Sequence, residues 1–346
     1  MNRTQIGVAR CGAAAVLFGA TTPIAAQIAE DTTAPILAGL LYVGAAIAVV
    51  PFVGRRALDR EAARRGGRRL AVAVIAGGLI GPLLLAAGLS RTPAATASLL
   101  LNMELVATAV LAALVFGEHL GRRVVIGTCL VVAAGVALAW SGSPELRLGS
   151  LLVVGACVCW GLDNCVTAEL DEISPEHITL AKGVVAGGTN LLVGLAIGGA
   201  LPGGWETLLA LVVGALGYGA SITLWVTGAR DLGAARGQLV FSTAPFIGVG
   251  VAWALLGEPV RGAEVVALVL AAVGVLSVLG SDHTHDHAHE PVEHDHEHSH
   301  DDDHHDHRHP DLPPATRHAH RHSHRALVHT HPHVPDLHHR HNHVET

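Results

Sequence analysis

The sequence has few charged and few aromatic residues. Asp, Glu, Lys and Arg together make up 15% of the 346 residues, and Phe, Trp and Tyr make up 3%. Soluble domains usually carry about 25% charged residues, so the composition argues against a soluble globular protein. The sequence contains no Walker loop, dinucleotide-binding fingerprint or nucleophile elbow. An ATPase or a hydrolase is therefore not supported, and we predict that the protein is not an enzyme.

The cysteines do not form the pattern of a disulfide framework. All five lie in or beside apolar runs, at Cys11, Cys129, Cys157, Cys159 and Cys165. We expect them to be small buried packing residues. A soft-metal site near Cys159 and Asp163, which share a helix face, is the alternative.

Long apolar stretches dominate the first 280 residues. Half of the chain is hydrophobic and its mean hydropathy is +0.45. Stretches of about 18 or more apolar residues are long enough to cross a bilayer. We therefore predict an all-α polytopic membrane protein with ten transmembrane helices. The expected spans are 11–29, 33–53, 70–88, 94–116, 123–140, 148–168, 179–200, 205–227, 235–256 and 262–280.

One stretch of the chain occurs twice. Residues 88–140 match residues 228–280 when shifted by 140 positions, and Gly117-Glu118 then coincides with Gly257-Glu258. Self-similarity at a fixed spacing indicates a duplicated structural unit. We predict a first five-helix repeat over 11–140, a second over 148–280, and a separate tail over 281–346.

The arginines predict the orientation in the membrane. With a cytoplasmic N-terminus, the inside segments before the tail hold 13 arginines, seven of them in loop 55–69, and the outside segments hold three. Positive residues favour the cytoplasmic side. Because five is an odd number, the second repeat enters the membrane from the opposite side. We expect inverted repeats in the cytoplasmic (inner) membrane, with both termini in the cytoplasm.

These features resemble a known family. Trp160-Gly161 lies in the first helix of the second half, and AARGQLVFSTAPFIGVGVAWALLGEPV begins at Ala234. Together with five-plus-five inverted helices, they resemble the EamA-type transporters of the drug/metabolite transporter superfamily. In that family the fourth helix of each half usually carries a proline, then an apolar run ending in Gly-Glu. Pro245 and Glu258 match, whereas Leu105 replaces the proline in the first half. The resemblance covers residues 11–280 and implies transport, but not a substrate.

Ionisable residues within apolar spans usually mark a transport pathway. Glu104 lies at the middle of the expected fourth helix, and Asp163 lies in the sixth. A carboxylate there takes up a proton, binds a metal ion or holds a substrate ammonium group; a protonated or paired structural acid is the alternative. Lys182 either pairs with Asp163 or extends toward the membrane surface.

Several neighbouring residues are further candidates for substrate binding or coupling. We expect Asn102 and Asn164 to hydrogen-bond across helices or to line a cavity, and Trp160 and Tyr218 to line the path or to pack. Pro245 is expected to loosen its helix by removing a backbone hydrogen bond. The site is therefore predicted between the two fourth helices. Glu118 and Glu258 are expected to be structural.

The tail is rich in histidine. Of 25 histidines, 23 lie between His283 and His343, and from Ser281 onward 13 acidic residues and 5 arginines give a net charge of −8. Its low apolar content predicts disorder. Imidazoles bind Zn, Ni, Co or Cu ions. The expected ligands are His283, His285, His287, His289, His294, His296, His298, His300, His304, His305, His307 and His309. A pH-responsive polyelectrolyte and an uninvolved extension are the alternatives.

The sequence leads to three functional hypotheses. The first is a secondary transporter that exports a small solute by alternating access, with proton coupling, no required cofactor and a metal-binding tail. The second is a divalent transition-metal (Ni, Co or Zn) transporter whose tail captures or senses the metal. The third, of another class, is a membrane-tethered metal buffer or sensor. The expected partners are a small-molecule or metal-ion substrate, the lipid bilayer and a second copy in a homodimer, without nucleic acid.

Overall fold

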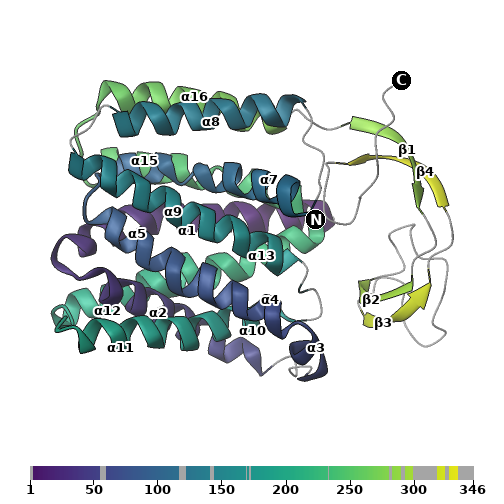
Figure 1. The fold of residues 1–346 in the computed structure, drawn as a ribbon, viewed down its shortest axis with the longest axis horizontal. Coiled ribbons are helices and arrows are strands. Elements are labelled where there is room, and N and C mark those ends of the chain that lie inside the picture. Colours follow the sequence, from purple (N-terminus) through teal and green to yellow (C-terminus); the bar gives the residue numbers. More distant parts are fainter. Residues whose placement is uncertain are drawn as a thin grey trace.

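The computed structural model of the protein is a bundle of long helices (Figure 1). It describes residues 3–54, 60–116, 122–140, 144–168, 170, 173–232 and 234–279, and four strands of the tail. The first half contains α1 (Arg3–Asp31), α2 (Ala34–Val53), α3 (Arg60–Arg65), α4 (Gly67–Val72), η1 (Ala73–Ile80), α5 (Gly81–Leu89), α6 (Ala94–Leu100), α7 (Met103–Phe116) and α8 (Arg122–Trp140).

The second half follows a similar order, with one more π-helical segment among its described residues. It contains α9 (Pro144–Ala168), α10 (Pro175–Ala181), η2 (Lys182–Gly187), α11 (Gly188–Ala196), α12 (Gly204–Val213), η3 (Gly214–Ala220), α13 (Ser221–Leu232), α14 (Ala234–Phe241), α15 (Ala244–Ala254) and α16 (Gly262–Leu279). The last helices of the two halves, α8 and α16, pack side by side at one edge of the bundle (Figure 1).

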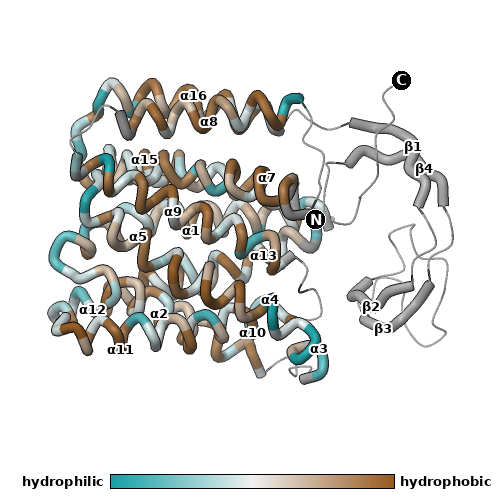
Figure 2. Tube along the Cα trace, viewed as in Figure 1, coloured by the Kyte–Doolittle hydropathy of each residue, from teal (hydrophilic) through white to brown (hydrophobic). Residues whose placement is uncertain are grey.

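In the described part of the chain, seven helical stretches are long and apolar enough to cross a membrane. They are Thr4–Asp31, Ala34–Val53, Gly67–Leu89, Ala94–Leu111, Leu146–Thr167, Pro175–Ala196 and Gly204–Ala229. Figure 2 shows hydrophobic residues along the helices and hydrophilic residues at α3 and near helix ends. Large apolar side chains also cover the outside, such as Leu114, which is 79% exposed, and Ile197, which is 69% exposed. Such a surface suits contact with lipid.

The expected number of ten spans is not confirmed by this criterion. The expected fifth, ninth and tenth spans correspond to α8, to α14 with α15, and to α16, which are not among the seven. The shorter apolar helices Ala244–Ala254 and Gly262–Ser277 account for part of the last two. The structure confirms a multi-pass helical membrane protein, and a count of ten stays a prediction.

Three of the described spans contain a π-helical segment in the middle. η1 lies between α4 and α5, η2 between α10 and α11, and η3 between α12 and α13. A π-helical turn inserts an extra residue and rotates the side chains that follow it, and such turns are frequent at functional sites. η1 and η3 occupy matching positions in the two halves, about 140 residues apart.

The fourth helix of each half is interrupted, which the sequence did not predict for the first half. The expected span 94–116 divides into α6 and α7, and the expected span 235–256 divides into α14 and α15. Polar side chains bind backbone carbonyls at both breaks. Asn102 Nδ2 donates to the carbonyl of Leu99 at 3.1 Å, and Ser242 Oγ donates to the carbonyl of Gln238 at 2.8 Å. Side chains of this kind compete with the helical backbone bonds and favour a bend.

The first helix of each half crosses the fourth span of the other half. A Cβ atom added at Gly19 of α1 would overlap with the carbonyl oxygen of Ala244 in α15. A Cβ atom at Gly161 of α9 would lie 2.9 Å from the Ala107 Cβ atom and the Thr108 nitrogen in α7. Small residues allow such close helix crossings in membranes. This reciprocal packing explains why Phe18-Gly19 and Trp160-Gly161 are alike.

The tail forms short strands where the sequence predicts disorder. β1 (His283–His289) pairs with β4 (Leu327–His333), and β2 (Glu293–His298) pairs with β3 (His318–Ser323), both antiparallel. Disorder of the tail as a whole stays a prediction. Histidine at every second position matches the two-residue period of a strand, so the sequence is compatible with a backbone ladder. Isolated two-stranded ribbons are only marginally stable in water.

Candidate transport site

A cavity lies between the two halves in the middle of the bundle. It is lined by residues of α1, α2, α7, α9, α10, η2, η3, α13 and α14. The lining includes Thr167, near the end of α9, and Pro175, the first residue of α10. The cavity therefore extends from the middle of the bundle toward the end at which α9 stops and α10 begins.

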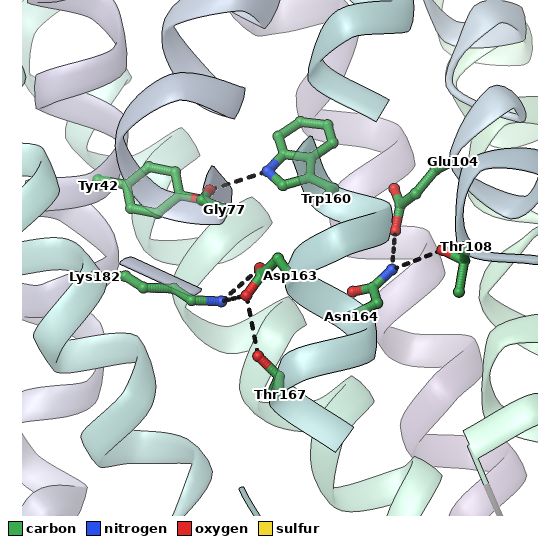
Figure 3. A network of polar contacts seen from close by, with 9 residues as sticks. All are labelled: Tyr42, Gly77, Glu104, Thr108, Trp160, Asp163, Asn164, Thr167 and Lys182. Atoms are coloured by element: carbon green, nitrogen blue, oxygen red, sulfur yellow. Dashed lines mark hydrogen bonds and ion pairs between the residues drawn. The ribbon is translucent and has the colours of Figure 1, made fainter. Parts of the chain in front are cut away.

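A buried ion pair occupies one wall of the cavity. Lys182 Nζ donates to both carboxylate oxygens of Asp163, at 2.7 and 2.6 Å, and the two side chains are 4% and 10% exposed. Thr167, one helical turn after Asp163, donates to the same carboxylate at 3.0 Å (Figure 3). The pair predicted from the sequence is present. Because each charge neutralises the other, the cost of burying them falls, and removal of one partner would leave the other unpaired.

Glu104 faces the cavity from the opposite wall, in the first turn of α7. Asn164 Nδ2 donates to Glu104 Oε1 at 2.8 Å and lies 3.4 Å from Thr108 Oγ1 (Figure 3). Among the residues that the structure describes, Glu104 has no cationic partner within salt-bridge distance. Asp163 and Asn164 are neighbours on α9, so one helix connects the ion pair to this second carboxylate.

The carbonyl of Gly77 in η1 connects the aromatic wall to the polar network. Tyr42 Oη donates to it at 2.7 Å and Trp160 Nε1 donates at 3.1 Å (Figure 3). Gly77 also lets α9 approach, because a Cβ atom there would overlap with the carboxylate of Asp163. The π-helical segment thus positions the backbone of η1 against the site.

Aromatic rings form the remaining wall. The Phe18 ring centroid lies 6.1 Å from that of Trp160, 5.7 Å from Tyr218 and 5.5 Å from Phe241. The rings of Phe18 meet Trp160 and Tyr218 edge to face. This arrangement is favourable for aromatic pairs and fixes the ring orientations.

Most of the candidate residues from the sequence meet at this cavity. They are Glu104, Trp160, Asp163, Asn164, Lys182 and Tyr218. Asn102 does not line it: the residue is 3% exposed and its amide bonds back to the helix at the break. Pro245 does not line it either, but both expected fourth spans contribute to the lining, the first through Glu104 of α7 and the second through Gln238 and Phe241 of α14. A transport site between these two spans stays a prediction. Glu104 faces α9, and the second half contributes α14 in place of α15.

The expected effect of Pro245 is corrected. Pro245 is the second residue of α15, which begins at Ala244. A proline in the first turn of a helix removes no intrahelical hydrogen bond, because that N–H has no partner there. Pro245 therefore begins a helix and does not loosen its interior.

Sequence reasoning missed the other lining residues. Phe18, Tyr42, Trp225, Gln238 and Phe241 also line the cavity. In the sequence, an aromatic residue that lines a cavity cannot be distinguished from one that packs in the core. The hydrophobic periodicity therefore does not identify the aromatic lining residues. The rarity of tyrosine could have indicated two of them, because the sequence has only two tyrosines and both line the cavity.

Polar contacts join the two halves at the other end of the bundle. Glu258 accepts hydrogen bonds from the backbone nitrogens of Ala94 and Ala95, at 2.7 and 2.9 Å, and so caps α6. Glu264, 1% exposed, accepts a bond from Thr96 Oγ1 at 2.8 Å. A carboxylate suits a helix N-terminus because the free N–H groups and the helix dipole are positive there. Glu258 thus has the expected structural role, and Glu118 lies outside the described residues.

Metal-ligating groups do not cluster in the described helices. No set of three or more His, Cys, Asp or Glu side chains there could hold a metal ion. Cys157 donates weakly to the backbone carbonyl of Leu100 at 3.6 Å and is fully buried, as a packing residue is. The alternative soft-metal site beside Asp163 is therefore not supported. Of the predicted tail ligands, His300, His304, His305, His307 and His309 lie outside the described residues.

Known proteins share both the sequence pattern and the fold. The model of the EamA-like transporter family matches residues 5–140 and again residues 147–280. An "Uncharacterized transporter" of Methanothermobacter thermautotrophicus is 30% identical over 205 residues, which is 57% of this chain and 60% of the relative. "Uncharacterized transporter YyaM" of Bacillus subtilis is 24% identical over 229 residues, 62% of this chain and 74% of the relative.

A solved crystal structure has the same fold. It is 19% identical, covers 80% of this chain and 98% of its own, and superposes with a TM-score of 0.59. Fold, hydropathy and these matches together define a multi-pass membrane transporter. The chain belongs to the EamA-like transporter family and carries two copies of its repeat. The resemblance inferred from the sequence is confirmed.

Proposed function

We propose that the protein is a secondary transporter that exports a small solute across the cytoplasmic membrane by alternating access. The observation that carries this proposal is the central cavity, which both halves line and which holds buried charges at mid-bundle. Binding sites at the interface of two repeats, near the middle of the membrane, are typical of such transporters. Both termini lie in the cytoplasm in this proposal, as the arginine distribution predicts.

The contacts at the far end of the bundle would act as the closed gate. Glu258 and Glu264 connect the end of the second half to the start of α6 in the first half. The cavity lining runs toward the opposite end, which is the cytoplasmic end in the proposed orientation. Export then requires the Glu258 and Glu264 contacts to separate while the cytoplasmic end closes.

Glu104 is proposed as the group that couples protons to solute. Its carboxylate faces the cavity and is held by the neutral amide of Asn164. A carboxylate without a fixed cation can bind either a proton or a cationic group of the solute, and this competition couples the two. Asp163 is unsuited to this role because Lys182 and Thr167 already occupy its oxygens.

Vesicles containing the full-length protein test the proposal. They would be incubated in a mixture of cell metabolites, with and without a proton gradient, and their contents identified by mass spectrometry. We expect at least one solute to accumulate only with protein and gradient present, and Glu104→Gln to abolish this. Glu206→Gln, at an exposed residue of α12, is the matched control. Unchanged gradient-driven accumulation by the Glu104→Gln protein would exclude the coupling role.

Transport of a divalent metal is the second candidate, and the tail is its support. The described helices offer no cluster of metal ligands, which favours a small solute as the substrate of the bundle. Uptake of Zn²⁺, Ni²⁺ and Co²⁺ into the same vesicles distinguishes the two. Metal flux that depends on Glu104 and Asp163 would favour the metal candidate.

We further propose that the tail binds transition-metal ions. The backbone register pairs histidine with histidine at three positions of each ribbon, including His285 with His331 and His296 with His320. Directly paired positions on one face are about 5 Å apart, close enough for two imidazoles to share an ion. Calorimetric titration of the full-length protein with Zn²⁺ tests this, and His285→Ala with His331→Ala should weaken binding.

The hypothesis of a membrane-tethered metal buffer predicts metal binding without flux of any solute. The vesicle experiment therefore also separates that hypothesis from transport. Homodimer formation stays a separate expectation, which light scattering of the purified protein in detergent would test.

A further inference from the structure

The cavity concentrates the aromatic residues of the chain. Half of all Phe, Trp and Tyr residues, including both tyrosines, line it, although aromatics make up only 3% of the sequence. The ring centroids of Tyr42 and Tyr218 are 5.5 Å apart, and those of Trp225 and Phe241 are 6.3 Å apart. The faces of aromatic rings carry partial negative charge and attract cations, and they also bind flat apolar groups.

Among the described residues that line the cavity, the charges do not balance. The Lys182 ammonium pairs with the carboxylate of Asp163, so the net charge of this pair is zero. Glu104 adds one further negative charge when ionised, and no described cation lies against it. An ionised carboxylate away from water is costly unless a cation or hydrogen bonds compensate it. A ligand with a single positive charge would supply that compensation.

Three buried polar atoms on the lining have no hydrogen-bond partner among the residues that the structure describes. They are Tyr218 Oη, Trp225 Nε1 and Thr179 Oγ1. Tyr218 and Thr179 are each 2% exposed. Buried polar atoms are nearly always hydrogen-bonded, so unpartnered ones in a cavity indicate a bound group. A Trp N–H can only donate, so the ligand must carry at least one acceptor as well as its cationic group.

We infer that the transported solute is an organic monocation, an amine with an aromatic or other apolar body and a hydrogen-bonding group. Its ammonium binds Glu104, and its body lies against the rings of Phe18, Trp160 and Tyr218. The hydrogen-bonding group meets Tyr218 Oη or Trp225 Nε1. This inference names the substrate class of the proposed transporter and so rests on that proposal. It disfavours organic anions, which Glu104 repels, and bare metal ions, which need several ligands.

Equilibrium binding to the full-length protein in lipid nanodiscs tests the inference. Displacement of radiolabelled tyramine would be measured with phenethylamine, with the uncharged 2-phenylethanol and with zwitterionic phenylalanine. We expect phenethylamine to compete at concentrations about tenfold lower than those needed for 2-phenylethanol. A tenfold difference in affinity corresponds to about 1.4 kcal/mol of binding free energy. Phenylalanine should compete at least tenfold less well than phenethylamine, because its carboxylate is near Glu104.

Two variants separate the charge from the polar contact. In Glu104→Gln the preference for phenethylamine over 2-phenylethanol should fall below threefold, whereas Glu206→Gln should retain it. Tyr218→Phe should weaken tyramine more than phenethylamine, because only tyramine carries a phenolic hydroxyl. Thermal unfolding of each variant shows whether it is folded, and phenethylamine binding to Tyr218→Phe provides a second check of the site.

The outcomes distinguish this inference from the proposed function. Equal binding of phenethylamine and 2-phenylethanol, or phenylalanine binding as tightly as phenethylamine, would overturn the amine class. If vesicles then still accumulate another solute under a proton gradient, the transporter proposal stands alone. If amines bind as expected but no solute crosses the membrane, the site is correct and transport is wrong.

Discussion

The two halves of the molecule have a similar order of helices and different chemistry. Their fourth helices are interrupted at matching places, between α6 and α7 and between α14 and α15. Two residues after the first break the chain has Glu104, whereas the matching residue of the second half, 140 positions later, is Ala244. Glu104 faces the cavity, and Ala244 packs against Gly19 of α1. One position therefore serves binding in one half and helix packing in the other.

The first helices differ in the same way. Asp163 and Asn164 follow Trp160-Gly161 in the second half, whereas Thr21 and Thr22 follow Phe18-Gly19 in the first. The two threonine hydroxyls donate to carbonyls of their own helix, with lengths of 2.8 to 3.0 Å. Asp163 and Asn164 instead bind side chains on other helices. Duplication thus provides a symmetric frame, and a few substitutions place the charge on one side of the cavity.

The largest expected effect comes from breaking the ion pair that only the second half contains. Asp163→Asn leaves the Lys182 ammonium buried without a counter-charge, and we expect a loss of about 3–5 kcal/mol of unfolding free energy. The double variant Asp163→Asn, Lys182→Met should recover most of this loss, because no charge remains to be buried. Denaturant unfolding in mixed micelles measures both.

Thr21→Val is the matched control in the first half. It removes a hydroxyl that only bonds its own helix, so its cost should stay below about 1 kcal/mol. If the double variant is as unstable as Asp163→Asn alone, the aspartate acts through something other than charge pairing.

The second prediction concerns the two glycine crossings. Gly19→Ala pushes a methyl group into a backbone carbonyl of α15, which cannot move independently of its helix. We expect a cost of about 1–3 kcal/mol, as for other overpacked sites. Gly161→Ala meets the Ala107 side chain and the Thr108 nitrogen at 2.9 Å and should cost less.

Gly12 of α1 provides the reference for these crossings. A Cβ atom there meets nothing within 4 Å, so Gly12→Ala should be neutral or stabilising because alanine favours helix. Thermal unfolding of the three variants in one detergent gives the order. A larger loss for Gly161→Ala than for Gly19→Ala would reverse the comparison of the two crossings.

Charge in an apolar sequence was the most reliable guide to the site. Glu104, Asp163 and Lys182 are rare enough in their spans to be noticed, and the structure brings all three to one cavity. The fold class followed from hydropathy and from the 140-residue repeat, which depend on composition and spacing alone. The family model confirms the two repeats.

Other features depend on tertiary contacts that spacing does not encode. The break at Asn102 has no proline, and it arises from a side chain that bonds a nearby carbonyl. The π-helical segments shift their helix faces in ways that a period of 3.6 residues does not describe. Trp225 and Phe241 reach the cavity only because of how α13 and α14 pack.

Replacement of Glu258 by Gln should have a smaller effect, a loss of about 1 kcal/mol of unfolding free energy. Glu258→Gln keeps one carbonyl oxygen for the α6 nitrogens but loses the second acceptor and the charge at the helix N-terminus. Unfolding in micelles measures the loss, and Glu206→Gln, in the exposed first turn of α12, should show a smaller loss. Faster solute flux in Glu258→Gln would support its role in the closed gate, whereas unchanged stability and flux would reduce it to an incidental contact.

Replacement of Pro245 should have the smallest effect, although proline is the clearest difference between the two fourth helices. Pro245 lies in the first turn of α15, where its missing N–H has no intrahelical partner. Pro245→Ala should cost only about 0.4–1 kcal/mol, through greater freedom of the unfolded chain. The break itself should persist, because Ser242 and Thr243 still donate to the carbonyls of Gln238 and Val240, both at 2.8 Å. Hydrogen exchange measures this directly: the amides of Ser242, Thr243, Ala244 and Phe246 should exchange at the same rate in the variant as in the original protein. Their rates should be comparable to those of residues 101–105 in the first half. Slow exchange at 242–246 in the variant would mean that proline creates the break in one half and Asn102 in the other, so that the halves reach the same backbone by different means.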